Sequence, residues 1–181
     1  MPSAFQQKLA FGQAAESSIA KWLRGRGHFV LPVYDLEYDT GKGPRLFTPS
    51  GQLIAPDLLC IKDGKTIWVE AKHKTVFSWF RKTSRWVTGI DLRHYEDYCN
   101  VADQTDVPIW LIFLHRASIP SGEDLRYGCP AECPTGLYGQ DLKICRRNES
   151  HRSNRHGRSG MVYWWEGSLH KLGTLQQIPL D

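Results

Sequence analysis

The chain has 181 residues, of which 41% are hydrophobic and 23% are charged, and its formal net charge is +4. This length suits one domain with a sizeable core and is short for two, and the composition is that of an ordinary globular protein rather than a disordered or collagenous one. The longest purely apolar run, Ile109 to Leu114, is far too short to span a membrane, and the first residues, Met1 to Leu9, lack the apolar core of a signal peptide. We therefore expect a cytoplasmic protein with no membrane partner.

The first half of the chain predicts a helix, a strand and a loop. Apolar residues recur at helical spacing within residues 4–24, and Gly25 and Gly27 supply the stop. Residues 28–34 are strand-like, with Pro32 pointing to a sheet edge. Residues 39–52 are rich in Gly, Pro and Thr and predict a loop.

A β-hairpin is the strongest local prediction. Two β-rich runs, residues 57–62 and 65–72, flank the turn dipeptide Asp63-Gly64. Residues 91–105 then predict a second helix, and residues 107–115 predict a central strand covered on both faces.

The remainder of the chain is less regular in pattern. Residues 116–160 hold many Gly, Pro, Ser and Arg and predict an irregular, basic, Cys-containing extension, followed by a late strand at residues 161–165. The element order predicts a single α/β domain, residues 1–181, with a core over about 5–115 and a mixed β-sheet flanked by helices.

The hairpin places chemistry at one end of a strand. Because side chains alternate across a strand, Glu70 and Lys72 share one face while Val69 and Ala71 face the other. Asp57 opens the neighbouring antiparallel strand and should lie near Glu70. Two adjacent carboxylates repel one another unless a cation lies between them, and Mg²⁺ prefers such oxygen ligands.

A further carboxylate supports this site. Glu16 flanks the apolar stripe of the first helix, three residues before Ile19. Burying Glu16 without a partner would be costly. Coordination to a metal ion, either directly or through a water molecule, would provide that partner.

This pattern resembles the PD-(D/E)XK nuclease superfamily, with its restriction-endonuclease-like fold. The matching residues are Pro56-Asp57, twelve intervening residues, and Glu70-Ala71-Lys72, with Glu16 as the helical acid. Two other D-x-K strings occur. Asp63-Gly64-Lys65 is the hairpin turn, and the residues before Asp141-Leu142-Lys143 do not look strand-like.

The resemblance implies a nuclease that hydrolyses DNA phosphodiester bonds with Mg²⁺, or Mn²⁺ in its place, in repair, recombination or phage DNA processing. It implies that Asp57, Glu70, the backbone carbonyl of Ala71 and Glu16 form the metal site, and that Lys72 orients the attacking water and offsets transition-state charge. Small resolvase-like nucleases are similar in size, and cutting two strands would favour a homodimer. Branched, single-stranded, free-ended and site-specific DNA all remain open as substrates.

Two basic stretches suit a polyanionic partner, although two solvated loops would show the same charges. Residues 72–85 carry five cations and no acid, and residues 143–158 carry six cations and one acid. The candidate DNA-binding residues are Lys74, Arg81, Lys82, Arg85, Arg146 and Arg147. Four aromatics interleave the first stretch and suit either base stacking or the core. His94, on the second helix, is assigned to a solvated face, with a phosphate contact by Arg93 or His94 as the alternative.

Two alternatives to a nuclease remain. The first is a DNA-binding protein that keeps this fold without cleaving. The second is a zinc-stabilised interaction protein, for which Cys129, Cys133, Cys145 and His151 are the candidate ligands. Unpaired loop cysteines are the preferred interpretation of these residues, because their spacing is not typical of a zinc site.

Overall fold

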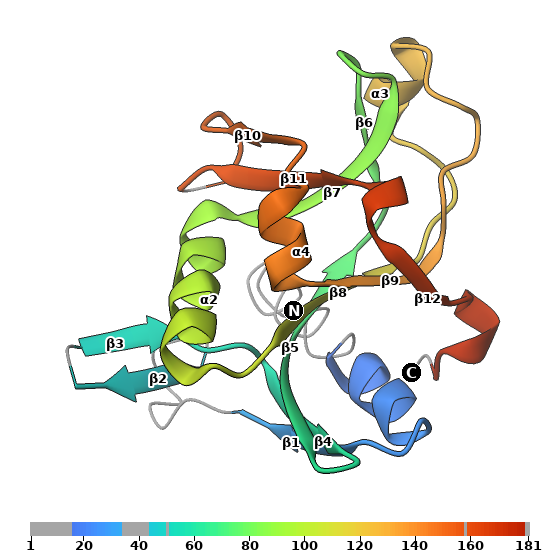
Figure 1. The fold of residues 1–181 in the computed structure, drawn as a ribbon. Coiled ribbons are helices and arrows are strands. Elements are labelled where there is room, and N and C mark those ends of the chain that lie inside the picture. The colour runs from blue at the N-terminus through green and yellow to red at the C-terminus, as the bar shows by residue number, and fades with distance from the viewer. Residues whose placement is uncertain (1–15, 34–43, 50, 158, 180–181) are drawn as a thin grey trace, which may run out of the picture.

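A central six-stranded sheet organises the molecule (Figure 1). The computed structural model describes residues 16–33, 44–49, 51–157 and 159–179. The strand order is β1-β4-β5-β8-β9-β12, and only β5 and β8 run parallel. The bounds are β1 (Phe29–Pro32), β4 (Leu58–Lys62), β5 (Lys65–Lys74), β8 (Ile109–His115), β9 (Gly136–Asp141) and β12 (His170–Gly173). The expected mixed sheet is confirmed.

A second sheet of four strands, in the order β10-β11-β7-β6, is built from two distant parts of the chain. Its strands are β6 (Ser78–Phe80), β7 (Arg85–Asp91), β10 (His151–Ser153) and β11 (Met161–Trp165). Strands β2 (Arg45–Thr48) and β3 (Gly51–Ile54) form a separate hairpin. The helical segments are residues 16–24, α2 (Leu92–Thr105), α3 (Gly122–Arg126) and α4 (Leu142–Arg147), with the short turns η2 (Glu166–Ser168) and η3 (Leu175–Gln177).

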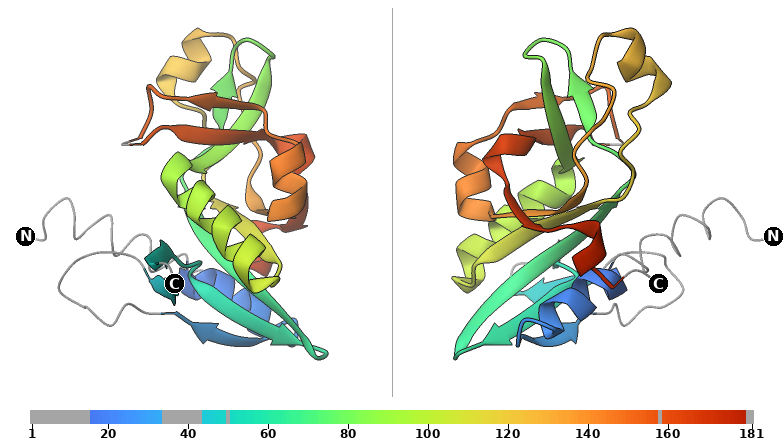
Figure 2. Two further views of the ribbon diagram at one scale, coloured as in Figure 1. Left: turned by 60° about the vertical axis from the view of Figure 1, so that its left-hand side comes forward. Right: turned by 90° about the vertical axis from the view of Figure 1, so that its right-hand side faces the viewer.

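Both faces of the central sheet are covered, as Figure 2 shows. On one face, Ile19 and Leu23 of the first helix pack with Val69 and Leu114. On the other face, α2 and the second sheet pack over the strands through a larger cluster that includes Tyr98 and Phe113. The continuous apolar run of β8 follows from this double burial. None of the helices in the described part of the chain is long and apolar enough to cross a membrane.

The predicted hairpin is confirmed as β4 and β5. Lys62 pairs with Lys65 across the turn, where Asp63 and Gly64 have φ values of 50° and 72°. Two positive φ angles are what a tight two-residue hairpin turn requires, and Asp-Gly is a favoured pair for it. The predicted second helix, central strand and late strand are confirmed as α2, β8 and β11, and Asp91 caps α2 rather than belonging to it. The first helix ends before Gly25 and Gly27 as expected, while its predicted start at residues 4–15 lies outside the described residues.

Two predictions of irregular structure are wrong. Within residues 39–52, predicted as a loop, the described part forms β2 and the start of β3, whose Leu46 and Leu53 pack against the larger core cluster. Residues 116–160 contain α3, β9, α4 and β10 instead of an irregular extension. β9 is rich in glycine because its backbone is closely approached: a Cβ at Gly139 would lie 2.8 Å from Leu172 Cδ1. Packing therefore overrides the weak local β-propensity of this segment.

Candidate active site

The β4–β5 hairpin brings Asp57 beside Glu70 and Lys72. Leu58 pairs with Val69 in the antiparallel hairpin. Asp57, which precedes Leu58, therefore lies beside Glu70, which follows Val69. The backbone N–H of Ala71 donates to Asp57 Oδ2 over 2.9 Å. Lys72 Nζ forms an ion pair with Glu70 Oε1. Two carboxyl groups and one ammonium group are thus gathered where β4 begins.

The Glu70 carboxylate is buried under α2. Its exposed fraction is 0%, and neither of its oxygens accepts a hydrogen bond of normal geometry from the described residues. The ammonium of Lys72 is therefore its main compensation, since a buried carboxylate is costly without a partner. Glu70 and Lys72 do share a strand face, as expected, but this face is covered as completely as the Val69 face.

The electrostatics of the site reflect crowded carboxyl groups. Burial, and next the charge of Glu70, raise the pKa of Asp57 to about 7. Burial, and next the charge of Asp57, raise the pKa of Glu16 to about 7. Burial disfavours the charged form of Lys72, but Glu70 and Asp57 outweigh this and raise the pKa of its ammonium. Glu16 thus lies within electrostatic reach of Asp57 and Lys72 although it comes from the helix on the opposite face of the sheet.

These residues fit a Mg²⁺ ion by the chemistry of their donors. Among the described residues, no three His, Cys, Asp or Glu side chains converge as a ready-made metal group. Mg²⁺ does not require one, because it is commonly held by one or two carboxylates and keeps several waters. A cation between Asp57 and Glu70 would relieve the repulsion that raises the pKa of Asp57.

Helix α2 contributes two further side chains to the site. Tyr98 is 1% exposed, and its pKa is raised well above its usual value by burial and then by Glu70 and Asp57. His94, one turn earlier, is half-buried with its ring 6.2 Å from that of Tyr98. Burial, and next the charge of Lys72, lower the pKa of His94. The assignment of His94 to a solvated face is therefore wrong. The i, i+4 spacing of His94 and Tyr98 was the available signal.

Three basic residues of the first stretch, Arg81, Lys82 and Arg85, lie on the β6–β7 hairpin and its turn. Arg81 forms an ion pair of 2.8 Å with Glu123, and its guanidinium lies 3.0 Å from the centroid of the Tyr127 ring. Lys82 is exposed in the turn, and Arg85 lies over the Trp165 ring at 4.4 Å.

Lys74 lies nearer to the candidate site than the basic residues of the β6–β7 hairpin do. It ends β5, the strand that carries Glu70 and Lys72, and burial followed by the charge of Lys72 lowers its pKa to about 8. The aromatics of this stretch divide: Phe77 is 0% exposed in the core, while Trp79 and Trp86 form an edge-to-face pair on the hairpin.

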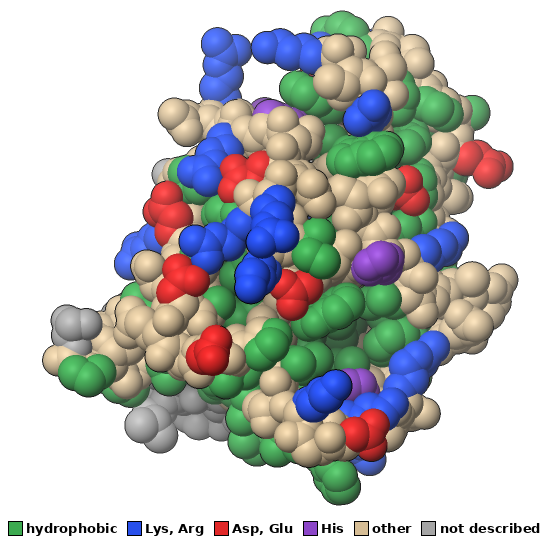
Figure 3. Space-filling view, in the orientation of Figure 1, with side chains coloured by type: hydrophobic (Ala, Val, Ile, Leu, Met, Phe, Trp, Pro, Cys, Tyr) green, Lys and Arg blue, Asp and Glu red, His purple; other side chains and the backbone are tan. Residues whose placement is uncertain are grey.

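The described part of the second basic stretch forms α4 and β10 instead of a solvated loop. Arg146 and Arg147 occupy the last turn of α4, where Arg146 pairs with Asp103 of α2 at 2.8 Å. Figure 3 shows Lys and Arg side chains gathered over the α4 region, with acidic side chains between them. The candidate DNA-binding residues thus lie on three separate parts of the fold, namely β5, the β6–β7 hairpin and α4.

The four candidate zinc ligands are not brought together. Cys133 Sγ donates to the carbonyl oxygen of Ala117 over 3.2 Å, and Cys145 is buried in α4. The His151 ring is stacked between Phe80, at 3.8 Å, and Tyr163, at 4.6 Å.

The Asp141-Leu142-Lys143 string needs a different explanation from the one the sequence suggested. The residues before it do form a strand, β9, so that reason for rejecting it was wrong. Asp141 instead caps α4: its Oδ1 accepts a hydrogen bond of 2.7 Å from the backbone N–H of Lys143.

Comparisons with known proteins find structural similarity only. No family model matches the chain, and no curated protein sequence does. A solved Holliday junction resolvase from the hyperthermophile Archaeoglobus fulgidus is 8% identical with a TM-score of 0.49, covering 87% of this chain and 90% of that one. A nuclease from a fusselovirus is 12% identical with a TM-score of 0.40, covering 95% and 89%. The strand order of the central sheet and the β4–β5 hairpin show a mixed β-sheet flanked by helices, as the sequence predicts.

Proposed function

We propose that this protein is a Mg²⁺-dependent nuclease that hydrolyses DNA phosphodiester bonds in repair, recombination or phage DNA processing. One observation carries the proposal: Asp57 lies beside the buried Glu70, which is paired with Lys72, at one end of the hairpin. A structural surface ion pair would not need a second, repelled carboxylate or full burial.

Each residue has a role in this proposal. Asp57, Glu70 and the carbonyl of Ala71 would hold Mg²⁺, with Glu16 at the edge of the same group. When bound, the ion would polarise the scissile phosphate and lower the pKa of an attacking water. Lys72 stays protonated beside two carboxylates, so it donates hydrogen bonds that orient this water and offsets charge on the reacting phosphate.

Tyr98 acts through Glu70 rather than on DNA. It is buried on α2 close to the Glu70 carboxylate and so restricts where that carboxylate can point. We expect Tyr98→Phe to keep cleavage but to raise the Mg²⁺ concentration needed for half-maximal cleavage by about 10- to 100-fold, because residues that contact a metal ligand tune metal affinity by that factor.

The direct test is a DNA cleavage assay with Mg²⁺ or EDTA. We expect cleavage by the wild type in Mg²⁺ only, and a loss of at least about 100-fold in Asp57→Asn and in Lys72→Ala. Glu132→Gln, which removes an exposed carboxylate outside the site, serves as the control and should cleave normally. Equal cleavage by wild type, Asp57→Asn and Lys72→Ala would refute the assignment.

The proposal that DNA is the partner is tested by measuring DNA binding in the presence of EDTA. Replacing Arg81, Lys82 and Arg85 together with alanine should lower the salt dependence of binding. Each lost phosphate contact lowers the slope of log K against log salt concentration by about 0.9. Arg81 is already held by Glu123, so we expect this slope to change by about 2. An unchanged slope would remove the β6–β7 hairpin from the DNA-binding surface.

A further inference from the structure

Lys74 places a second ammonium group beside the candidate active site. It ends β5 two residues after Lys72, and because side chains alternate along a strand, it lies on the same face as Glu70 and Lys72. Glu70 is paired with Lys72, but in the part of the chain that the structure describes no carboxylate forms an ion pair with Lys74. Burial and the charge of Lys72 lower the pKa of Lys74 to about 8, and no acid counteracts them. A partly desolvated ammonium of this kind is costly unless an anion accompanies it.

The neighbouring strand supports Lys74 with uncharged rings. Lys74 pairs with His115 of β8, which is 0% exposed and is stacked on the Phe77 ring at 3.6 Å. The Tyr138 ring approaches His115 edge-on at 6.1 Å. Burial, and next the charge of Lys74, lower the pKa of His115 to about 3, so its imidazole is neutral at neutral pH. These rings therefore hold the end of β5 without neutralising Lys74.

Several other cations of the described chain are already held by acids at ion-pair distance, namely Arg81 by Glu123, Arg146 by Asp103 and Arg152 by Glu149. An anion that binds one of these arginines must compete with its carboxylate. An anion that binds Lys74 would meet no such competitor among the described residues, and it would relieve the cost of the unpaired charge.

The end of β5 is accessible from the side of the candidate active site. β4 pairs with β5 only as far as Leu58 and Val69, whereas β8 pairs with β5 as far as Lys74. Along residues 70–74, the β4 side of β5 therefore has no strand paired to it in the described ranges, and the Asp57 carboxylate lies at its start. The Lys72 side chain is 30% exposed and Lys74 is half-buried, so solvent reaches both residues.

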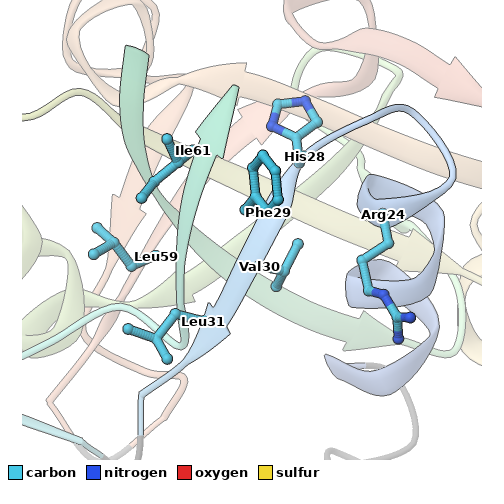
Figure 4. A pocket seen from close by; sticks show the side chains of 7 residues that line it. All are labelled: Arg24, His28, Phe29, Val30, Leu31, Leu59 and Ile61. Atoms are coloured by element: carbon cyan, nitrogen blue, oxygen red, sulfur yellow. The ribbon is translucent and has the colours of Figure 1, made fainter. Parts of the chain in front are cut away.

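A cavity at the β1 edge of the central sheet is a poorer place for a phosphate group. Its volume is about 310 Å³, and its lining is apolar except for Arg24 and His28 (Figure 4). Burial, and next the charge of Lys62, lower the pKa of His28, so its ring is neutral at neutral pH. None of the lining residues belongs to the candidate active site.

Resting on the nuclease function proposed above, we propose that Lys74 forms a second phosphate subsite, which binds the phosphate next to the scissile one on the same DNA strand. Two residues along a strand span about 7 Å. Successive phosphates of a DNA strand are separated by a similar distance, because each nucleotide adds six backbone bonds. With the scissile phosphate at Lys72, the neighbouring phosphate thus reaches Lys74. The substrate is then a strand with at least two consecutive phosphates.

The first test is binding of a DNA duplex to the full-length protein in EDTA. We expect Lys74→Met to weaken binding by about tenfold and to lower the slope of log K against log salt concentration by about 0.9. Lys65→Met is the matched control, because it removes an exposed lysine from the other end of the same strand, and it should change binding by less than about twofold.

The second test locates the contact by cleavage in Mg²⁺. The substrate is the DNA that the wild type cleaves fastest among duplex, single-stranded, flapped and four-way-junction forms. A neutral methylphosphonate replaces one of the two phosphates that flank the cleaved bond. At one of these positions, the replacement should slow the wild type by about tenfold and Lys74→Met by less than about twofold, because the contact is already lost in that variant.

Three outcomes would overturn the proposal. One is equal binding by Lys74→Met and Lys65→Met, and another is equal sensitivity of wild type and Lys74→Met to both methylphosphonates. The third is a lower Tm of DNA-free Lys74→Met, since removing an uncompensated ammonium should raise the Tm. Failure of the nuclease function would look different: no DNA would be cleaved in Mg²⁺, while Lys74→Met would still bind DNA more weakly than Lys65→Met in EDTA.

Discussion

Replacing Lys72 with methionine removes the ammonium group that compensates the buried Glu70 carboxylate. Breaking a buried ion pair by removing one partner costs about 3–5 kcal/mol. The Lys72 side chain is 30% exposed, so water screens part of this loss, and we expect the lower end, about 3 kcal/mol, in the metal-free protein. For a protein of this size, that corresponds to a fall in Tm of about 6–12 °C.

The assay is urea unfolding at neutral pH in EDTA, arranged as a double-mutant cycle. Glu70→Gln keeps the shape of the side chain and removes its charge, so adding it to Lys72→Met should restore most of the lost stability. We expect a coupling energy of about 2 kcal/mol between the two positions. Lys143→Met, which removes an exposed lysine from α4, should change stability by less than about 0.5 kcal/mol. Additive effects of Lys72→Met and Glu70→Gln would show that the pair is not coupled and would refute this reasoning.

Three further predictions concern pH, packing and metal removal. Because the pKa of Asp57 rises from 3.8 to about 7 on folding, its stabilising contribution is complete below pH 3.8 and lost as the pH rises through 7. Asp57→Asn should therefore gain Tm relative to the metal-free wild type between pH 4 and 8, and a constant difference would contradict this. Gly89→Val should lower the free energy of unfolding by more than about 2 kcal/mol, because even a Cβ at Gly89 would lie 2.3 Å from the Val162 carbonyl oxygen. Gly122→Ala, with open space around it, is the control for that variant. Treatment with EDTA should release no stoichiometric zinc, since the four candidate zinc ligands are apart, and metal analysis that finds one zinc per chain would contradict this.

The sequence was most informative where local signals agreed with the fold. Asp63-Gly64 fixed the hairpin, and the apolar run of β8 fixed the centre of the sheet. It was least informative where packing decides the structure. β9 is held by strands on both sides despite its glycines, and α4 has only six residues, with Leu142 and Cys145 as its buried pair. Such short elements carry too few positions for a period to stand out.

The candidate site was predicted only in part, because some of its residues are placed by local strand geometry and others by the packing of α2. Strand alternation was enough to place Glu70 and Lys72 on one face, because it requires only local geometry. The roles of His94 and Tyr98 were not predictable in this way. They depend on which side of α2 faces the central sheet, and the second sheet, formed partly by residues 151–165, packs against that helix as well.

Both sheets are completed by a late part of the chain. β11 pairs with β7, from which it is separated by more than 60 residues, and β12 forms the outer edge of the central sheet beside β9. During synthesis, β7 and β9 therefore wait for residues 161–173 with one edge unpaired, and unpaired edges invite aggregation. A fragment that ends near residue 115 would keep Asp57, Glu70 and Lys72 but lack these partners. Shortened forms of the protein should accordingly retain the residues of the site and lose the ability to fold around them.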